Sequence, residues 1–297
     1  MYEKILVPLD GSDLAENALP YAEELAGTLG CEITLIHVSE SADEKYENMH
    51  QLYIEKIVEA TKQGAERYRK NKRSKKIDVS SVHLTGHVAE QIVDYAAKEN
   101  NSLIVMTTHG RSGIRRWILG NIAAKVVRAT DRPIALIRAK DTPPEARAER
   151  RLNKILVPLD GSKASEVVIP HVSELASKLK AEVVLFQVVA PSYFVYAIPG
   201  EAVLQPHSPE DLQNMIENSK LYLDKVGAEF RDKGIETTSE VGIGGPAEEI
   251  IRIADEIQVD MVAMSTHGHS SISLWAFGSN ADKVLHAGDT PVLLVRT

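Results

Sequence analysis

The chain has 297 residues, of which 43% are hydrophobic and 26% are charged, a balance typical of globular proteins and long enough for two domains. Its formal net charge of −8 argues against a general nucleic-acid-binding protein, whose affinity for phosphate backbones comes mainly from clustered lysine and arginine. One cysteine, Cys31, allows no internal disulfide, and no apolar run reaches the roughly 18 residues of a membrane span, so we expect a cytoplasmic protein without a membrane segment.

The chain contains an internal repeat. The nine residues KILVPLDGS at 4–12 recur letter for letter at 154–162. The offset between the copies grows from 150 to 158 by the Thr-His-Gly triplets at 108–110 and 266–268, so the second copy holds eight extra residues. Recurrence predicts two domains of one fold. We place these domains at residues 1–140 and 153–297, joined by a linker at 141–152.

In the first copy the hydrophobic pattern predicts five strands that alternate with four helices. The strands are expected at 4–9, 32–38, 77–84, 102–108 and 133–138. The helices are expected from Ser12, with a bend at Pro20, then at about 48–72, at 89–98 and from Asn121.

The second copy repeats this order. Its strands are expected at 153–159, 182–189, 235–241, 260–266 and 291–296, and its helices from 163, at about 209–233, from 247 and from 279. The proline-bearing insertion at 191–207 is predicted to be a loop of restricted shape. Strands that alternate with helices predict an α/β fold, with a five-stranded, mainly parallel sheet covered by helices on both faces in each domain.

Polar loops follow the first and fourth strands of each copy. In an open parallel sheet, ligands bind outside the carboxyl ends of the strands where the strand order reverses. If these two strands are neighbours, Asp10 and Asp160 stand at the mouth of a cleft, each followed by Gly-Ser. Such a carboxylate could accept hydrogen bonds from ribose hydroxyls or hold hydrated Mg²⁺. Alternatively, it could be a turn residue that caps the next helix.

The loop from Gly110 to Gly120 has the character of an anion site. Glycine lets the backbone turn tightly and approach a ligand, and Asn121 then stands at the start of a helix, beside unsatisfied N–H groups and the positive end of the helix dipole. The alternative is a loop end that only caps a helix. The matching residues of the second copy are Gly268, Gly278 and Ser279.

Together these motifs resemble the universal stress protein family in its tandem, two-domain form. The resemblance covers nearly the whole chain and rests on VPLDGS, on GHVAEQI and GGPAEEI, which open the third helices, on Thr-His-Gly, and on Gly-Asn or Gly-Ser before the last helices. It implies two Rossmann-like (adenine nucleotide alpha hydrolase-like) domains. It also implies that the last strands of the two copies, which would otherwise be exposed sheet edges, pair with each other within the chain.

The nucleotide-binding members of that family have Gly-x-x-Gly, nine residues, then Gly-Ser or Gly-Thr. This chain departs from the pattern at Thr107 and Ser265, which replace the first glycine, and at Asn121, while Ser279 matches. The resemblance places Asp10 and Asp160 at the ribose and Val38 and Val188 beside the adenine. The full set of binding residues that it implies is Pro8, Asp10, Val38, Thr107, Gly110, Arg111, Gly120, Asn121, Pro158, Asp160, Val188, Ser265, Gly268, His269, Gly278 and Ser279.

The two expected clefts differ in charge. Between the two later glycines the first copy carries Arg111, Arg115 and Arg116, whereas the second carries only His269. Arginine can bind two phosphate oxygens at once. His267 and His269 form a His-x-His pair without a third ligand at a telling spacing, so we expect no transition-metal site. No Ser-His-Asp or Cys-His arrangement is readable, so no catalytic residue is assigned.

These observations lead to one main hypothesis, a stress-response regulatory protein that binds ATP or another adenine nucleotide, with Mg²⁺ through Asp10 and Asp160, in one or both clefts. One alternative is a nucleotide-free scaffold of the same fold, which the departures at Thr107, Ser265 and Asn121 favour. Another is a slow ATP hydrolase. A homodimer and an unknown protein partner are compatible with all three hypotheses.

Overall fold

The structure is a computed structural model, and it describes residues 2–40, 44–69, 76–109, 119–138, 152–190, 193–198, 201–206, 208–268 and 278–297. The predicted linker therefore lies outside the described residues, except for Leu152.

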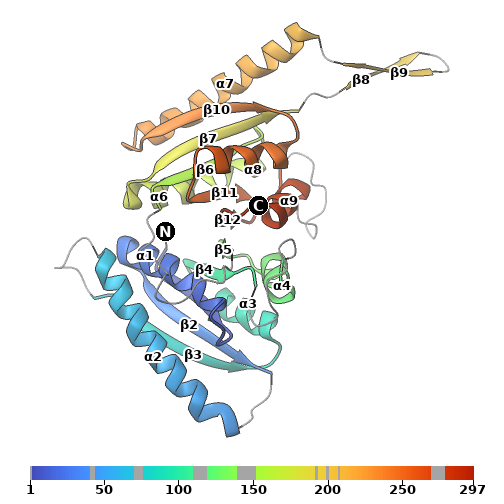
Figure 1. The fold of residues 1–297 in the computed structure, drawn as a ribbon. Helices are drawn as coiled ribbons and strands as arrows, with labels where there is room; N and C mark the ends of the chain where they lie inside the picture. Colours follow the sequence, from blue (N-terminus) through green and yellow to red (C-terminus); the bar gives the residue numbers. More distant parts are fainter. Residues whose placement is uncertain are drawn as a thin grey trace.

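The first half alternates strands and helices as predicted (Figure 1). Its elements are β1 (Lys4–Leu9), the 3₁₀ turn η1 (Ala15–Ala18), α1 (Leu19–Leu29), β2 (Glu32–Ser39), α2 (Glu44–Tyr68), β3 (Val79–Thr85), α3 (Val88–Lys98), β4 (Ser102–Thr107), α4 (Asn121–Ala129) and β5 (Ile134–Ile137).

The second half repeats the series with one added hairpin. Its elements are β6 (Lys154–Pro158), α5 (Lys163–Glu166), α6 (Ile169–Leu179), β7 (Glu182–Val189), β8 (Tyr193–Ile198), β9 (Glu201–Pro206), α7 (Pro209–Arg231), β10 (Thr237–Ile243), α8 (Pro246–Glu256), β11 (Met261–Ser265), α9 (Ser279–Ala287) and β12 (Val292–Val295).

Ten of the strands form one continuous sheet in the order β10-β7-β6-β11-β12-β5-β4-β1-β2-β3. Within each half of this sheet the strands pair in parallel, and β1 lies between β2 and β4, as β6 lies between β7 and β11. The halves meet where β5 pairs antiparallel with β12, Ala135 opposite Leu293. The predicted pairing of the last strands is therefore confirmed.

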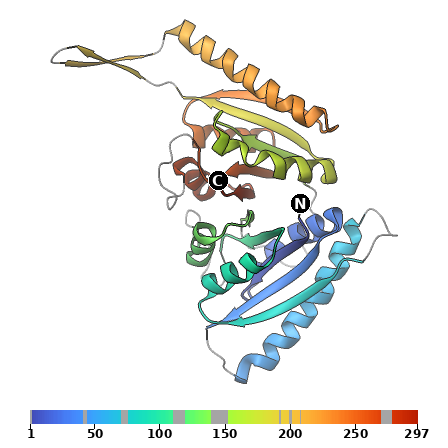
Figure 2. The same cartoon turned by 180° about the vertical axis from the view of Figure 1, so that it is seen from behind.

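Two apolar layers cover the sheet. One packs α1, α2, α6 and α7 against residues such as Ile33 and Leu35 of β2, and the other packs α3, α4, α8 and α9 against residues such as Ile36 and Ile104. Alternate side chains of each strand thus enter opposite layers. The two views in Figures 1 and 2 show helices on both sides of the strands in each half, as predicted.

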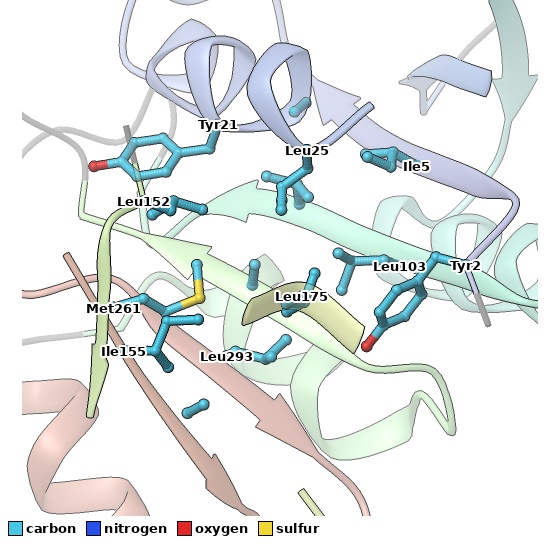
Figure 3. Packing of buried hydrophobic residues seen from close by; sticks show 14 of the residues in the cluster. Tyr2, Ile5, Tyr21, Leu25, Leu103, Leu152, Ile155, Leu175, Met261 and Leu293 are labelled. Atoms are coloured by element: carbon cyan, nitrogen blue, oxygen red, sulfur yellow. The ribbon is translucent and has the colours of Figure 1, made fainter. Parts of the chain in front are cut away.

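The first of these layers runs without interruption from one half into the other. Tyr21 and Leu25 of α1 lie opposite Leu152 and Leu175 of the second half (Figure 3). Polar contacts join the same surface: the backbone N–H of Leu152 donates to Glu24 Oε1 at 2.9 Å, and Tyr2 Oη lies 2.6 Å from His171 Nδ1. The buried apolar area here holds the halves together in addition to the β5–β12 pairing.

Two local predictions were wrong. The helix expected from Ser12 with a bend at Pro20 is a 3₁₀ turn followed by α1, and Pro20 lies in the first turn of α1. Proline lacks an N–H and suits a first helical turn, where that group has no partner within the helix. Pro170 occupies the same position in α6.

The insertion predicted as a loop contains the antiparallel hairpin β8–β9, with Tyr193 opposite Pro206 and Ile198 opposite Glu201. Its tyrosine, phenylalanine, valine and isoleucine residues favour strands, and Pro206 stands at a strand end, where it interrupts no pairing. The hairpin extends away from the ten-stranded sheet (Figure 2).

Helices α1 and α2 cross at very short range. A Cβ atom on Gly27 would lie 2.3 Å from the carbonyl oxygen of Ala65, and one on Gly64 would lie 2.1 Å from the carboxyl carbon of Glu23. The Glu23 carboxyl group is therefore enclosed by the crossing. Burial raises the pKa of Glu23 to about 7, although the positive charge of Arg67 opposes the rise.

Replacement of Glu23 by glutamine should stabilise the protein at pH 8 and leave it nearly unchanged at pH 5. The folded state keeps the Glu23 proton up to about pH 7. The unfolded chain releases that proton near pH 4.5, so the wild type loses stability as the pH rises between these values. We expect a gain of about 2 kcal/mol at pH 8, measured by urea unfolding at both pH values. Equal effects at the two pH values, or an equal gain in the exposed control Glu90→Gln, would refute this account.

Candidate functional site

The predicted site residues lie at the carboxyl edge of the sheet in both halves. Asp10 follows β1, Val38 is near the end of β2, and Thr107 ends β4, which is the direct neighbour of β1. Asp160, Val188 and Ser265 hold the same positions on β6, β7 and β11. The expected adjacency of the first and fourth strands is thus observed, and the strand order reverses between them.

The Asp-Gly-Ser segment after the first strand is a hydrogen-bonded turn. Asp10 Oδ1 accepts from both the backbone N–H and the hydroxyl of Ser12, and Ser12 Oγ accepts from the N–H of Ala15 at 3.2 Å. Asp160, Ser162 and Ser165 make the same contacts. The intervening glycines have φ values of 78° and 82°, in the left-handed region that glycine adopts without strain. One oxygen of each aspartate therefore has the turn-forming role that was the local alternative.

In the second half this turn faces the loop after the fourth strand. A Cβ atom on Gly268 would lie 2.3 Å from Asp160 Oδ2, so the carboxylate and the backbone of Gly268 are in close contact. A larger residue at 268 would displace the carboxylate. The structure thus brings together Asp160 and Gly268, two of the predicted site residues from separate strands. The corresponding residues of the first half are Asp10 and Gly110, and Gly110 lies outside the described residues.

Thr107 and Ser265, which stand where the resemblance has glycine, are buried and hydrogen-bonded within their own turns. Thr107 Oγ1 donates to the carbonyl oxygen of His109 at 2.8 Å, and Ser265 Oγ donates to that of His267. Both hydroxyl groups thus point back into the Thr-His-Gly turn. The departures from glycine add a stabilising contact to the turn.

Helices α4 and α9 each begin beside the fourth strand. Gly120 and Gly278 are their N-cap residues, and Asn121 and Ser279 are the first helical residues. The N–H of Gly120 donates to Thr108 O at 2.9 Å, and a Cβ atom there would lie 2.8 Å from the same oxygen. Gly278 has the same relation to Thr266 O. Glycine is thus required by packing, so a bulky substitution at 278 would disturb the fold as well as any ligand.

The first N–H groups of α4 and α9 give this edge positive polarity. In the described part of the chain neither helix has a side-chain cap, and the dipole of a nine-residue helix favours an anion at this end. Arg111 and His269, which would add charge, lie in the loops outside the described residues, as does Gly110.

Two hydrogen-bonded pairs, each of a tyrosine and a glutamate that follows the Asp-Gly-Ser turn, were missed by the sequence prediction. Tyr53 Oη donates to Glu16 Oε1 at 2.9 Å, and Tyr222 Oη donates to Glu166 Oε1 at 2.9 Å. Burial raises the pKa of Tyr222, and its bond to Glu166 and the charge of Asp160 act in the same direction. The two tyrosines stand at different positions along α2 and α7, so the repeat did not reveal them.

The histidines of the Thr-His-Gly turns contact neighbouring hydroxyl groups. His109 Nδ1 lies 3.1 Å from Thr108 Oγ1, and His267 Nδ1 lies 2.9 Å from Thr266 Oγ1. These contacts fit a role in the turn. Among the residues that the structure describes, no group of three or more histidine, cysteine, aspartate and glutamate side chains could hold a metal ion.

Comparison with known proteins identifies the family. The family model for the universal stress protein family matches residues 1–138 and 151–296. The chain belongs to the universal stress protein family. Universal stress protein Slr1230 of Synechocystis is 23% identical over 320 residues, which cover 99% of this chain and all of that protein. Universal stress protein MJ0531 of Methanocaldococcus jannaschii is 28% identical over 141 residues, 46% of this chain and 83% of the relative.

A solved structure has a similar fold over nearly its whole chain. The universal stress protein from Archaeoglobus fulgidus DSM 4304 superposes with a TM-score of 0.66 and 21% identity, covering 99% of this chain and 98% of that one. At this identity the likeness concerns the fold. Within the described ranges, no helix of this universal stress protein combines the length and apolarity needed to cross a membrane.

Replacement of Thr107 by valine should lower the free energy of unfolding by about 1–2 kcal/mol, because the hydrogen bond that Thr107 Oγ1 donates to the His109 carbonyl is lost while the side-chain shape is kept. Thermal and urea unfolding would measure the change. Thr85→Val, at the exposed end of β3, is the matched control and should be nearly neutral. A Thr107 variant as stable as that control would show that the hydroxyl bond has no role in holding the turn.

Proposed function

We propose that this universal stress protein binds ATP or another adenine nucleotide in one or both of its clefts and acts as a cytoplasmic stress-response regulator. The observation that carries the proposal is the juxtaposition, at the point of strand reversal, of an aspartate turn and the N-terminal end of a helix. The aspartate is suited to ribose hydroxyls, and the helix end is suited to phosphates.

The two clefts would differ in how they hold the phosphates. The first cleft carries Arg111, Arg115 and Arg116 in its loop, whereas the second has Gly278-Ser279, the family's own final pair. The backbone N–H groups at the start of α9 and the Ser279 hydroxyl would serve the phosphates in the second cleft. We assign the adenine to the side of Val38 and Val188, which are partly buried at the ends of β2 and β7.

The donor set also fits a Mg²⁺ ion that arrives with the nucleotide. Mg²⁺ is commonly bound by one or two carboxylates together with phosphate oxygens and water. Each cleft offers one such carboxylate, Asp10 or Asp160, with Oδ1 engaged in the turn. The ion would neutralise phosphate charge beside an acidic side chain.

A nucleotide-free scaffold is the second candidate, favoured by the buried Thr107 and Ser265 side chains at the positions where the resemblance has glycine.

One universal stress protein that resembles half of this chain was solved in complex with cAMP, at 18% identity. That likeness is too distant to transfer a ligand, so the case for a nucleotide depends on this chain's own residues.

Isothermal titration with ATP, AMP and cAMP, with and without Mg²⁺, tests the proposal. We expect heat from ATP with the wild type. Asp10→Asn and Asp160→Asn should each weaken binding at their own cleft by about tenfold, because a charge-assisted hydrogen bond to the ribose is lost.

Asp255→Asn, at an exposed position of α8, is the matched control and should bind as the wild type does. Absence of heat with every nucleotide would overturn the proposal in favour of the scaffold. Equal weakening in the Asp255 variant would show that the aspartate turns are not the site.

A further inference from the structure

Two arginines cross from one half to the other. Arg138 follows β5 and Arg296 follows β12, and the antiparallel pairing of these strands directs the end of each toward the start of the other. The last helix of each half ends just before that half's final strand. Arg138 therefore lies at the C-terminal end of α9, and Arg296 lies at the C-terminal end of α4.

The guanidinium groups bind the terminal carbonyls of these helices. Arg138 Nη1 and Nη2 donate to the carbonyl oxygens of Leu285 and His286 in α9, at 3.4 and 3.2 Å. Arg296 Nη1 donates to those of Arg128 and Thr130 at the end of α4, at 3.3 and 3.1 Å. The last carbonyls of a helix lack partners within the helix and carry its negative dipole end, so a cation there is favourable.

The other ends of α4 and α9 are the candidate phosphate sites, and hydrogen bonds connect them to the same arginines. The N–H of Gly120 donates to Thr108 O, and the N–H of Thr108 donates to Ile137 O at 2.8 Å, one residue before Arg138. In the second half, Gly278 donates to Thr266 O and Thr266 donates to Val295 O at 2.9 Å, one residue before Arg296.

These contacts form a closed network of hydrogen bonds and helices. It runs from the start of α4 through Thr108 and Arg138 to the end of α9, along α9 to Gly278, and through Thr266 and Arg296 back to the end of α4. Thr297 Oγ1 lies 3.2 Å from His267 Nδ1 and adds a contact between this network and the Thr-His-Gly turn of the second half. Each helix is thus held at one end by its own half and at the other end by the partner half.

We propose that Arg138 and Arg296 couple the two clefts. A change at the N-terminal end of one helix, α4 or α9, then alters the stability of the N-terminal end of the other helix, and hence its affinity for an anion. Hydrogen-bond networks and rigid helices can carry energetic coupling between two sites, and such coupling acts in both directions. The closed network of hydrogen bonds and helices supplies this connection between the two clefts. The affinity part of this inference rests on the proposed nucleotide function, whereas the structural part does not.

The two arginines should contribute unequally to the stability of the helices that they contact. The Arg138 side chain is 11% exposed and the Arg296 side chain is 26% exposed, so water competes less with the bonds that Arg138 makes to α9. Loss of Arg138 should therefore loosen α9 more than loss of Arg296 loosens α4.

Amide hydrogen exchange without ligand tests the structural part in Arg138→Met and Arg296→Met. We expect exchange to rise about fivefold or more across 278–287 in the first variant and, less strongly, across 120–129 in the second. Arg132→Met is the matched control, because Arg132 binds the carbonyls of Ala96 and Ala97 at the end of α3 within its own half. That control should loosen α3 alone. Unchanged exchange in α9 of the Arg138 variant would overturn the proposal.

Titration with ATP and Mg²⁺ then tests the affinity part. In the wild type, the Asp160→Asn change should alter affinity at the first cleft, and in the Arg138→Met, Arg296→Met double variant it should not. The same response to Asp160→Asn in both backgrounds would overturn the proposal. If no protein binds nucleotide while α9 still loosens in the Arg138 variant, the proposed function fails and the structural coupling between the halves stands.

Discussion

The antiparallel pairing of β5 with β12 is the contact on which the rest of the architecture depends. Without it, each half would expose the backbone of a short, wholly apolar strand at the edge of its sheet, and such edges invite aggregation. With it, two five-stranded sheets become one, and the apolar layer containing α1 and α6 closes over both halves. The pairing also brings Arg138 and Arg296 to the opposite half's last helix. The arrangement of the two halves and the connection between the clefts therefore depend on one set of backbone hydrogen bonds.

The candidate clefts show how one set of residues can serve both folding and binding. Asp10 and Asp160 form turns through Oδ1, and Gly120 and Gly278 are required by the carbonyl oxygen that each meets. The local alternatives raised by the sequence are thus correct descriptions of the turns. They do not compete with a ligand role, because turns of this kind hold the aspartate and the helix end in place before any ligand arrives, and such pre-organisation lowers the cost of binding.

Much of this fold could be predicted from the sequence, because the repeat and the apolar strand patterns act locally and do not depend on distant contacts. Asp160 and Gly268 could be placed at the same edge because the carboxyl ends of parallel strands lie together, whereas the adjacency of β6 and β11 had to be seen in the structure. The hairpin β8–β9 was missed because proline was taken as the sign of a loop, whereas Pro206 is the last residue of β9 and does not interrupt the strand. The contacts of Tyr222 with Glu166 and of Arg138 with Leu285 could not be predicted, since they depend on how α7 sits on its sheet and on the register between the halves. The raised pKa of Glu23 likewise depends on a helix crossing that periodicity does not reveal.

We propose that an adenine nucleotide binds at one or both of the two points of strand reversal. An electron-density map of crystals grown with ATP and Mg²⁺ tests it most directly. We expect density for the phosphates at the first N–H groups of α4 or α9, with the ribose against Asp10 or Asp160. Clear maps of both clefts at saturating nucleotide, with no ligand density in either or with the nucleotide bound elsewhere, would contradict it.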